Sequence, residues 1–325
     1  MRDRVMVTRR FDSDALDPLR DACEVRYCDE DAVLPRGDLL DAVAEVKGLV
    51  CTVTDRIDGE LLDRAPKLKV VSTVSVGYDH LDIKAATARG VLLTNTPDVL
   101  TETTADLTFG LILAAARRIV EGDRLLREGR STQWNFMGFL GQDVHGKVLG
   151  ILGLGRIGRA VARRARGFQM RVLYHNPRRL PDEREDELGV TWVDRDTLMR
   201  ESDFLSLHVP LNPGTRHCIS TADLSKMKPT AILINASRGP VVDEEALLNA
   251  LESGRIAGAG LDVYEREPQV TPGLLRLPQA VLTPHVGSAT VETRRKMTER
   301  AVYNCLEALR GRRPPDLLNP EVLSA

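Results

Sequence analysis

The sequence predicts an α/β protein built on parallel sheets, and two features of its 325 residues point to this class. Short runs of β-branched and aliphatic residues alternate with helical segments from one end of the chain to the other. These runs are almost continuously apolar, which is typical of parallel strands buried on both faces of a sheet. At about 150 residues per domain, the length corresponds to roughly two domains.

Ten of the apolar runs are predicted as strands because each has the length and side chains of a buried strand. They are residues 5–8, 48–52, 70–74, 91–94, 148–152, 171–174, 204–209, 231–235, 259–263 and 281–283. No segment of low complexity and no repeat of 20–50 residues interrupts the alternation of strands and helices.

Two longer helical patterns flank the second half of the predicted strands. The turn cluster at residues 95–98 is followed by apolar residues at helical spacing over 102–127, which indicates a linker that opens into a helix. The second pattern covers about 290–309, with Ala301, Leu306 and Leu309 on one side. We expect this second helix to return the chain to the first domain.

Charge and composition argue against two classes of partner. Lys and Arg number 45 against 47 Asp and Glu, and the net charge of −2 provides no global positive field for nucleic acid or anionic membranes. The longest apolar stretches, such as 107–116, are shorter than the roughly 18–20 residues that cross a bilayer. Residues 1–14 contain no apolar run of the kind found in signal peptides, so we expect a cytoplasmic protein.

The cysteines predict neither disulfides nor a metal site. They are odd in number and scattered without metal-ligand spacing, which is typical of reduced thiols in a reducing compartment. They are Cys23, Cys28, Cys51, Cys218 and Cys305.

A glycine motif gives the strongest local signal for a ligand. Residues 153–158 read Gly-Leu-Gly-Arg-Ile-Gly, directly after the predicted strand 148–152 and directly before a helical pattern at 159–168. Between strand and helix, Gly153 permits the tight turn, Gly155 allows a pyrophosphate to approach, and Gly158 lets helix and strand pack closely. The helix N-terminus then faces the phosphates, so the motif predicts a dinucleotide cofactor, with Arg156 and Ile157 inside the same loop. The alternative is a glycine-rich turn without a ligand.

The end of the next strand indicates which dinucleotide is used. An acidic residue about 20 positions after the motif holds the ribose hydroxyls of NAD, but Asn176 stands there, 18 residues after Gly158. Arg178 and Arg179 follow, and a guanidinium can bind a 2′-phosphate with two hydrogen bonds. We therefore expect NADPH to be preferred over NADH, unless the two arginines form only a solvated loop.

Three further residues follow predicted strands at the edge where parallel sheets bind ligands. Arg238 follows strand 231–235, Glu267 follows strand 259–263, and His285 follows strand 281–283. Singly, each is more often a surface ion or a structural histidine, but together they suit the reduction of a 2-oxo acid by a nicotinamide cofactor. A histidine supplies the proton, a carboxylate orients it and favours its protonated form, and an arginine holds the substrate's carboxylate or carbonyl.

The order of motifs resembles the D-isomer-specific 2-hydroxyacid dehydrogenase family over essentially the whole chain, and most closely its glyoxylate/hydroxypyruvate reductase branch, which includes bacterial enzymes that reduce 2-keto-D-gluconate. Besides the glycine loop, the matching segments are STVSVGYDH at 72–80, TPDVLTETTAD at 96–106, INASRGPVVD at 234–243, AGLDV at 259–263, EP at 267–268 and PHVGSA at 284–289.

This resemblance implies roles for individual residues. His285 would be the proton donor, Glu267 its partner and Arg238 the substrate anchor. The backbone N–H groups of Val76 and Gly77, with Ser75 nearby, would bind the substrate carboxylate, and Asp262 would face the nicotinamide amide. The residues that would line the cofactor site elsewhere are Val209, Pro210, Thr215, Ala236 and Gly287.

The resemblance also implies the domain organisation. A flavodoxin-like substrate domain would comprise residues 1–98 and 290–325, with a Rossmann cofactor domain, residues 99–289, inserted into it; both would be doubly wound parallel-sheet domains that close around the substrate. Members of the family are usually homodimers built largely from the cofactor domains. Trp134 would lie in the dimer arm, where it could reach the partner's active site.

Some alternatives stay open at this point. Glyoxylate, hydroxypyruvate and 2-keto-D-gluconate are not ranked as substrates, and His80 departs from the asparagine common at that position. An NAD(H)-dependent enzyme for D-lactate, D-3-phosphoglycerate, formate or phosphite is a second interpretation, although such enzymes normally keep an acid near position 176. A corepressor-like protein that senses the cofactor through the same fold is a third.

Overall fold

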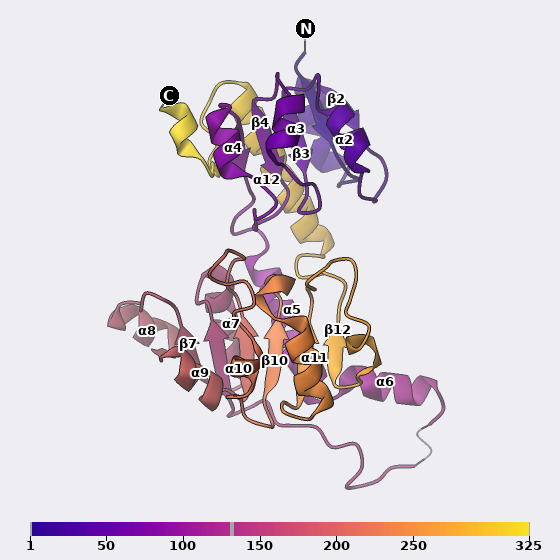
Figure 1. Cartoon of the computed structure of the whole chain (residues 1–325), viewed down its shortest axis with the longest axis vertical. Coiled ribbons are helices and arrows are strands. Elements are labelled where there is room, and N and C mark those ends of the chain that lie inside the picture. Colours follow the sequence, from indigo (N-terminus) through magenta and orange to yellow (C-terminus); the bar gives the residue numbers. More distant parts are fainter. Residues whose placement is uncertain (1, 131–132, 325) are drawn as a thin grey trace. The chain divides into compact units, whose positions relative to one another are not determined.

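The computed structural model describes residues 2–130 and 133–324, and Figure 1 shows its helices and strands. The chain divides into two compact units. Unit 1 contains Met1–Leu100 and Ser288–Ala325, and unit 2 contains Thr101–Gly287.

Unit 1 is built on a five-stranded parallel sheet in the order β2-β1-β3-β4-β5. Alternate residues of each strand point to opposite faces, so Leu49 packs with the helices on one face and Val50 with those on the other. Helices α2, α3 and α4 cover the first face, while α1 and α12 cover the second. The strands are β1 (Arg4–Val7), β2 (Glu24–Tyr27), β3 (Gly48–Cys51), β4 (Val70–Thr73) and β5 (Leu92–Thr94), and the helices are α1 (Asp17–Ala22), α2 (Arg36–Ala42), α3 (Gly59–Arg64), α4 (Ile83–Ala88) and α12 (Val291–Leu309).

Unit 2 is built on a seven-stranded parallel sheet in the order β12-β11-β10-β9-β6-β7-β8. Helices α5 and α7 cover one face, and α9, α10 and α11 cover the other. The strands are β6 (Val148–Leu152), β7 (Arg171–His175), β8 (Val190–Trp192), β9 (Phe204–Leu207), β10 (Ile232–Asn235), β11 (Gly258–Leu261) and β12 (Ala280–Leu282), and the helices are α5 (Thr101–Ala116), α6 (Ile119–Arg127), α7 (Arg156–Gly167), α8 (Asp182–Leu188), α9 (Arg195–Glu201), α10 (Thr221–Leu224) and α11 (Glu244–Glu252).

The strand order of unit 2 reverses beside β6. From β6 the chain first proceeds outward through β7 and β8, and then returns to place β9 on the other side of β6. In open parallel sheets, ligands bind at the carboxyl edge where the order reverses. A ligand of unit 2 is therefore expected beside the loops that follow β6 and β9.

The predicted fold class is confirmed, because both sheets are parallel and carry helices on both faces. All ten predicted strands are present, but two further strands, β2 and β8, were not predicted. Both lie at the edge of a sheet, and β2 has no fully buried residue. An edge strand that is exposed in part lacks the continuous apolar run by which the central strands are recognised.

The predicted helix over 102–127 is wrong in one respect, because it consists of two helices. Helix α5 ends at Ala116, and α6 begins at Ile119 after Arg118 adopts a left-handed φ of +52°. The backbone N–H of Gln142 donates to the carbonyl of Ala116 at 2.8 Å, so a segment distant in sequence takes the place of the next helical turn. Helical periodicity does not reveal such a competing hydrogen bond.

Two observations concern the surroundings of the protein. Across residues 2–130 and 133–324, no helix combines the length and apolar character needed to traverse a bilayer. The five cysteines are all free thiols, and three of them are buried.

Candidate active site

The glycine loop at 153–158 joins β6 to α7 with the geometry that a dinucleotide requires. Gly153 has a φ of +98°, and a side chain there would place its Cβ 2.7 Å from the carbonyl oxygen of His208. A Cβ on Gly158 would lie 2.4 Å from the carbonyl oxygen of Gly153, so α7 packs closely on the loop. Nothing lies within 4 Å of a Cβ built on Gly155, which precedes the first turn of α7. The open side of the loop thus leaves room for phosphates beside the N–H groups of the helix.

Asn176 braces the glycine loop from the end of β7. Its Oδ1 accepts a hydrogen bond of 2.7 Å from the backbone N–H of Leu154, and its carbonyl accepts one of 3.2 Å from Trp192 Nε1. The neutral side chain that replaces the acid of NAD-binding enzymes therefore holds the phosphate-binding turn. This contact was not foreseen from the sequence.

The two predicted phosphate-binding arginines have different surroundings. Arg179 donates to both oxygens of buried Glu185, at 2.9 and 2.8 Å, and also pairs with Asp182. The hydroxyl of Tyr174 adds a third hydrogen bond to Glu185 at 2.7 Å. Arg178 is exposed and has neither an ion pair nor a hydrogen bond with any residue that the structure describes. Of these two arginines, Arg178 could bind a ligand without giving up an ion pair that is present among residues 2–130 and 133–324.

The residues after β9 lie against the same loop. The Cγ1 of Val209 is 2.8 Å from the position of a Cβ on Gly153, and the backbone N–H of His208 donates to the Leu152 carbonyl at 2.8 Å. Thr215 closes the following turn, because its hydroxyl donates to the carbonyl of Pro210 at 2.6 Å. Val209, Pro210 and Thr215 thus belong to one compact turn beside the glycine loop.

Arg238 is carried by a turn that buried Asn235 organises. Asn235 Nδ2 donates to the Arg238 carbonyl at 2.9 Å, while its Oδ1 accepts from the backbone N–H and the hydroxyl of Ser237 at 3.1 and 2.8 Å. Asn235 is the last residue of β10 and is 1% exposed. Its buried side chain therefore fixes the backbone of the turn that contains Ala236, Ser237 and Arg238.

Asp262, just after β11, binds the segment that follows β12. It is 1% exposed, and its oxygens accept hydrogen bonds from the Thr283 hydroxyl at 2.6 Å and from the backbone N–H groups of Val286 and Gly287 at 2.8 Å each. Burial raises the pKa of Asp262, although these hydrogen bonds and the charge of His285 act in the opposite direction. All three donors to Asp262 belong to the loop around His285. The predicted contact of Asp262 with a nicotinamide amide stays a prediction.

His285 and Glu267 form a directly bonded pair. The Nδ1 of His285 donates to Glu267 Oε2 at 2.7 Å, and the other carboxylate oxygen accepts from the backbone N–H of Tyr264 at 3.0 Å. Both side chains are about one third exposed, and Nε2 of His285 makes no hydrogen bond within the described part of the chain. His285 also has a φ of +53°, a conformation that side chains other than glycine adopt at a cost.

The charge on Glu267 is favoured by its neighbours. Burial acts to raise the pKa of Glu267, but the hydrogen bond and charge of His285, the N–H of Tyr264 and the charge of Arg238 outweigh it, so the pKa lies below its usual value. Glu267 is therefore an anion at neutral pH. The influence of Arg238 on Glu267 also places the three predicted catalytic residues in one electrostatic environment.

The predicted substrate-binding residues Ser75, Val76 and Gly77 lie in unit 1, directly beyond β4. The Ser75 hydroxyl donates to the Gly77 carbonyl at 2.7 Å, and Asn95 Nδ2 donates to the Val76 carbonyl at 2.8 Å. Thr73 Oγ1 contacts both Ser75 Oγ and His80 Nε2 at 2.9 Å. The backbone N–H groups of Val76 and Gly77 donate no hydrogen bond among the described residues. The turn is thus fixed while two donors stay available.

The residues at the carboxyl edge of unit 2 fit a dinucleotide, because Gly155 is open, Gly153 and Gly158 permit the close turn, and Arg178 is unpaired among the described residues. Within the part of the chain that the structure describes, no group of three or more His, Cys, Asp or Glu side chains could hold a metal ion. This edge of unit 2 thus carries the hydrogen-bonded pair of His285 and Glu267, the turn of Arg238 and a glycine loop whose shape suits a dinucleotide.

Comparison with known proteins agrees with this geometry. The family model described as D-isomer specific 2-hydroxyacid dehydrogenase, NAD binding domain, matches residues 109–287. A glyoxylate reductase from Thermococcus litoralis is 48% identical over 329 residues, which cover 100% of this chain and 99% of that protein. Another, from Korarchaeum cryptofilum, is 49% identical over 326 residues, 99% of this chain and 98% of that protein.

Solved structures extend the likeness to the fold. A crystal structure of a protein from Thermus thermophilus has a TM-score of 0.90 and 47% identity, and covers 97% of this chain and 99% of that one. An NADPH-dependent glyoxylate/hydroxypyruvate reductase from Sinorhizobium meliloti, solved with NADP and malonate, has a TM-score of 0.86 and 33% identity over 98% of this chain and 97% of that one. As its motifs predict, the chain belongs to the D-isomer-specific 2-hydroxyacid dehydrogenase family.

Proposed function

We propose that this chain is an NADPH-preferring reductase that converts small 2-oxo acids into D-2-hydroxy acids. The observation that carries the proposal is the bonded pair of His285 and Glu267 at the edge of a sheet that also carries a dinucleotide-binding loop. A bound nicotinamide cofactor would supply a hydride to the carbonyl carbon of the substrate.

In this proposal His285 provides the proton that the reduced carbonyl oxygen needs. Glu267 accepts the Nδ1 hydrogen of His285, so the proton leaves from Nε2, and the Glu267 anion stabilises the protonated ring before transfer. After the transfer His285 is neutral, and it regains a proton from water through its exposed edge. Arg238 forms hydrogen bonds with the substrate and stabilises the negative charge that develops on the carbonyl oxygen.

The same proposal assigns substrate binding and cofactor contacts. The N–H groups of Val76 and Gly77, which have no acceptor in the described part of the chain, support a role in binding the substrate carboxylate, with Ser75 holding the turn. The glycine loop, Arg156 and Ile157 bind the pyrophosphate. The further cofactor contacts are assigned to Asn176, Val209, Pro210, Thr215, Ala236, Asp262 and Gly287.

For the cofactor's 2′-phosphate the proposal favours Arg178 and gives Arg179 a bracing role. Arg179 already satisfies buried Glu185, and its removal would leave a buried carboxylate without its partner. As the substrate we favour glyoxylate, because the relatives that are 48% identical are glyoxylate reductases. Hydroxypyruvate is the second candidate and 2-keto-D-gluconate a further one. Free thiols support a cytoplasmic location.

We also propose a homodimer. Exposed large apolar side chains gather on α6 and on the segment after it, whose residues 131–132 lie outside the described part, and a second copy of this chain would cover them. Trp134 is 83% exposed, and its ring lies edge-to-face with that of Phe136 at 6.0 Å between ring centroids, which supports its assignment to the dimer arm. The set is Ile119, Val120, Leu126, Trp134, Phe136, Met137, Phe139 and Leu140.

The first prediction concerns the proton donor. In His285→Asn we expect kcat for glyoxylate reduction to fall by about 10²–10⁴-fold, because no other group supplies the proton. The Kd of NADPH, measured by fluorescence titration, should stay within about twofold. The exposed His145 offers a control, and His145→Asn should be as active as the wild type. An active His285→Asn enzyme would refute the assignment.

The second prediction separates the two arginines. Arg178→Ala should raise KM for NADPH about tenfold and leave KM for NADH unchanged, because a charge-assisted hydrogen bond to the 2′-phosphate is lost. Arg313→Ala removes an exposed arginine that has no partner among the described residues, and it serves as the control. A KM for NADPH that Arg178→Ala leaves unaltered contradicts the assignment of Arg178, and a wild type that uses NADH more efficiently contradicts the cofactor preference.

The third prediction concerns assembly. The wild type should sediment at twice the mass of one chain at micromolar concentration, while Phe136→Asp should sediment as a single chain, because a charge is placed in the proposed contact. A wild type that sediments as a single chain under the same conditions would contradict the proposed dimer.

A further inference from the structure

His217 lies where three segments of the candidate active site meet, although the sequence patterns did not single it out. Its backbone N–H donates to the Pro240 carbonyl at 2.7 Å, and the N–H of Ile219 donates to the Val241 carbonyl at 3.0 Å. His217 is therefore joined to the segment that directly follows Arg238. It also stands two residues after Thr215, in the turn beside the glycine loop.

The ring of His217 contacts the segment that carries Glu267. Nε2 lies 2.8 Å from Oε1 of Glu265, which stands two residues before Glu267. The backbone N–H of Glu265 donates in turn to Oε1 of buried Glu244 at 2.5 Å, and Glu244 Oε2 accepts from the Thr271 hydroxyl at 2.6 Å. Hydrogen bonds thus fix the chain on both sides of Glu267, and one of them is formed by the His217 ring.

The segments after β10 and β11 also touch each other at this point. A Cβ on Gly239 would lie 1.8 Å from the carbonyl oxygen of Tyr264, so no side chain fits between the two backbones. Arg238 and Glu267 are therefore placed by one contact region, and a shift of residues 264–267 changes both. His217 is bonded to each side of this region.

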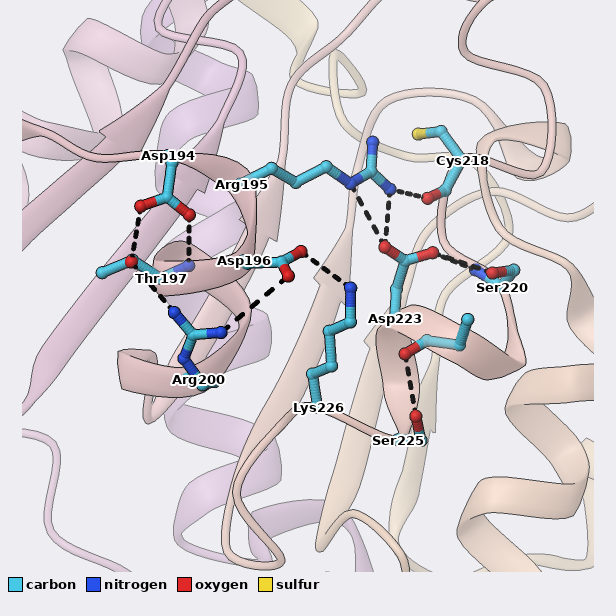
Figure 2. A network of polar contacts seen from close by, with 11 residues as sticks. Asp194, Arg195, Asp196, Thr197, Arg200, Cys218, Ser220, Asp223, Ser225 and Lys226 are labelled. Carbon is cyan, nitrogen blue, oxygen red and sulfur yellow. Dashed lines mark hydrogen bonds and ion pairs between the residues drawn. The ribbon is translucent and has the colours of Figure 1, made fainter.

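Cys218, the residue after His217, is held by a network of polar contacts (Figure 2). Arg195 donates to the Cys218 carbonyl and pairs with Asp223 at 2.9 Å, while Asp223 accepts a hydrogen bond of 2.8 Å from the Ser220 hydroxyl. This network fixes the residue next to His217, and His217 itself has a φ of +49°. A left-handed conformation at a bulky residue persists only where the surroundings hold it in place.

We propose that His217 is a positioning residue, which acts through Glu265 to hold the backbone that carries Glu267 and so aligns Glu267 with His285. This inference rests on the proposed function. The His217 ring touches neither substrate nor cofactor in this proposal; it sets the geometry of the acid–base pair.

The pair of His217 and Glu265 contributes little to stability, so its variants should fold. The side chains are 40% and 22% exposed, and partly exposed ion pairs of this kind add little to the free energy of unfolding. Its effect is geometric, because a small shift of a catalytic group lowers the rate strongly. The charged or titratable groups around the acid–base pair are Glu244, Arg238, Asp262, Tyr264 and Glu265, and all of them are retained in His217→Asn.

The test compares His217→Asn with Glu265→Ala and Glu265→Gln. Asparagine tolerates a positive φ but is too short to reach Glu265, and glutamine keeps an oxygen that accepts from His217. We expect His217→Asn and Glu265→Ala each to lower kcat for glyoxylate about 5–20-fold, with KM for NADPH changed less than about twofold. Glu265→Gln should retain most of the rate, and the double variant His217→Asn/Glu265→Ala should be no slower than either single variant. His145→Asn is the control.

The pH profile separates positioning from a merely structural effect. When Glu267 is misaligned it loses part of the hydrogen bond and charge interaction with His285 that lower its pKa, so the acidic limb of kcat/KM should move to higher pH. The titration midpoint of the Glu267 carboxyl group, followed by NMR without cofactor or substrate, should rise in the same direction. Unchanged midpoints and profiles in His217→Asn overturn the inference. The NMR result stands even if the wild type reduces no 2-oxo acid, so the two failures are distinguishable.

Discussion

The candidate site depends on the hydrogen bonds that the buried carboxyl group of Asp262 accepts from the loop around His285. A buried oxygen without a hydrogen-bond donor is costly, and Asp262 is satisfied only when Thr283, Val286 and Gly287 take their observed places. Those places impose the left-handed backbone of His285, which stands between them. The strain at His285 is thus maintained by hydrogen bonds to a single buried side chain, and the histidine is held ready for Glu267 before any ligand arrives.

The sheet explains why these groups come together. Parallel strands bring all their carboxyl ends to one edge, so residues after β6, β9, β10, β11 and β12 share that edge even though over a hundred residues separate the first from the last. Gly153 and Gly158 then bring α7 close enough for its N-terminus to face the same space. The glycine loop, Arg238 and the pair of His285 and Glu267 therefore come together because of one topology.

The sequence reveals those parts of the molecule that depend on local pattern. The central strands are continuous apolar runs, and Arg238, Glu267 and His285 stand out because they directly follow such runs. The edge strands β2 and β8 and the break at Arg118 depend on exposure and on a hydrogen bond from Gln142, which no periodicity records. Likewise, the pairing of Arg179 with Glu185 and of His217 with Glu265 joins side chains whose partnership only the folded chain shows. The different surroundings of Arg178 and Arg179 could therefore not be predicted from the sequence.

The proposed reduction of small 2-oxo acids by NADPH is tested most directly by one measurement. It is the initial rate of NADPH consumption by the purified wild type with glyoxylate and with hydroxypyruvate. We expect rapid consumption that requires the oxo acid, with D-glycerate as the product from hydroxypyruvate. No consumption with either acid, or formation of L-glycerate, would contradict the proposal.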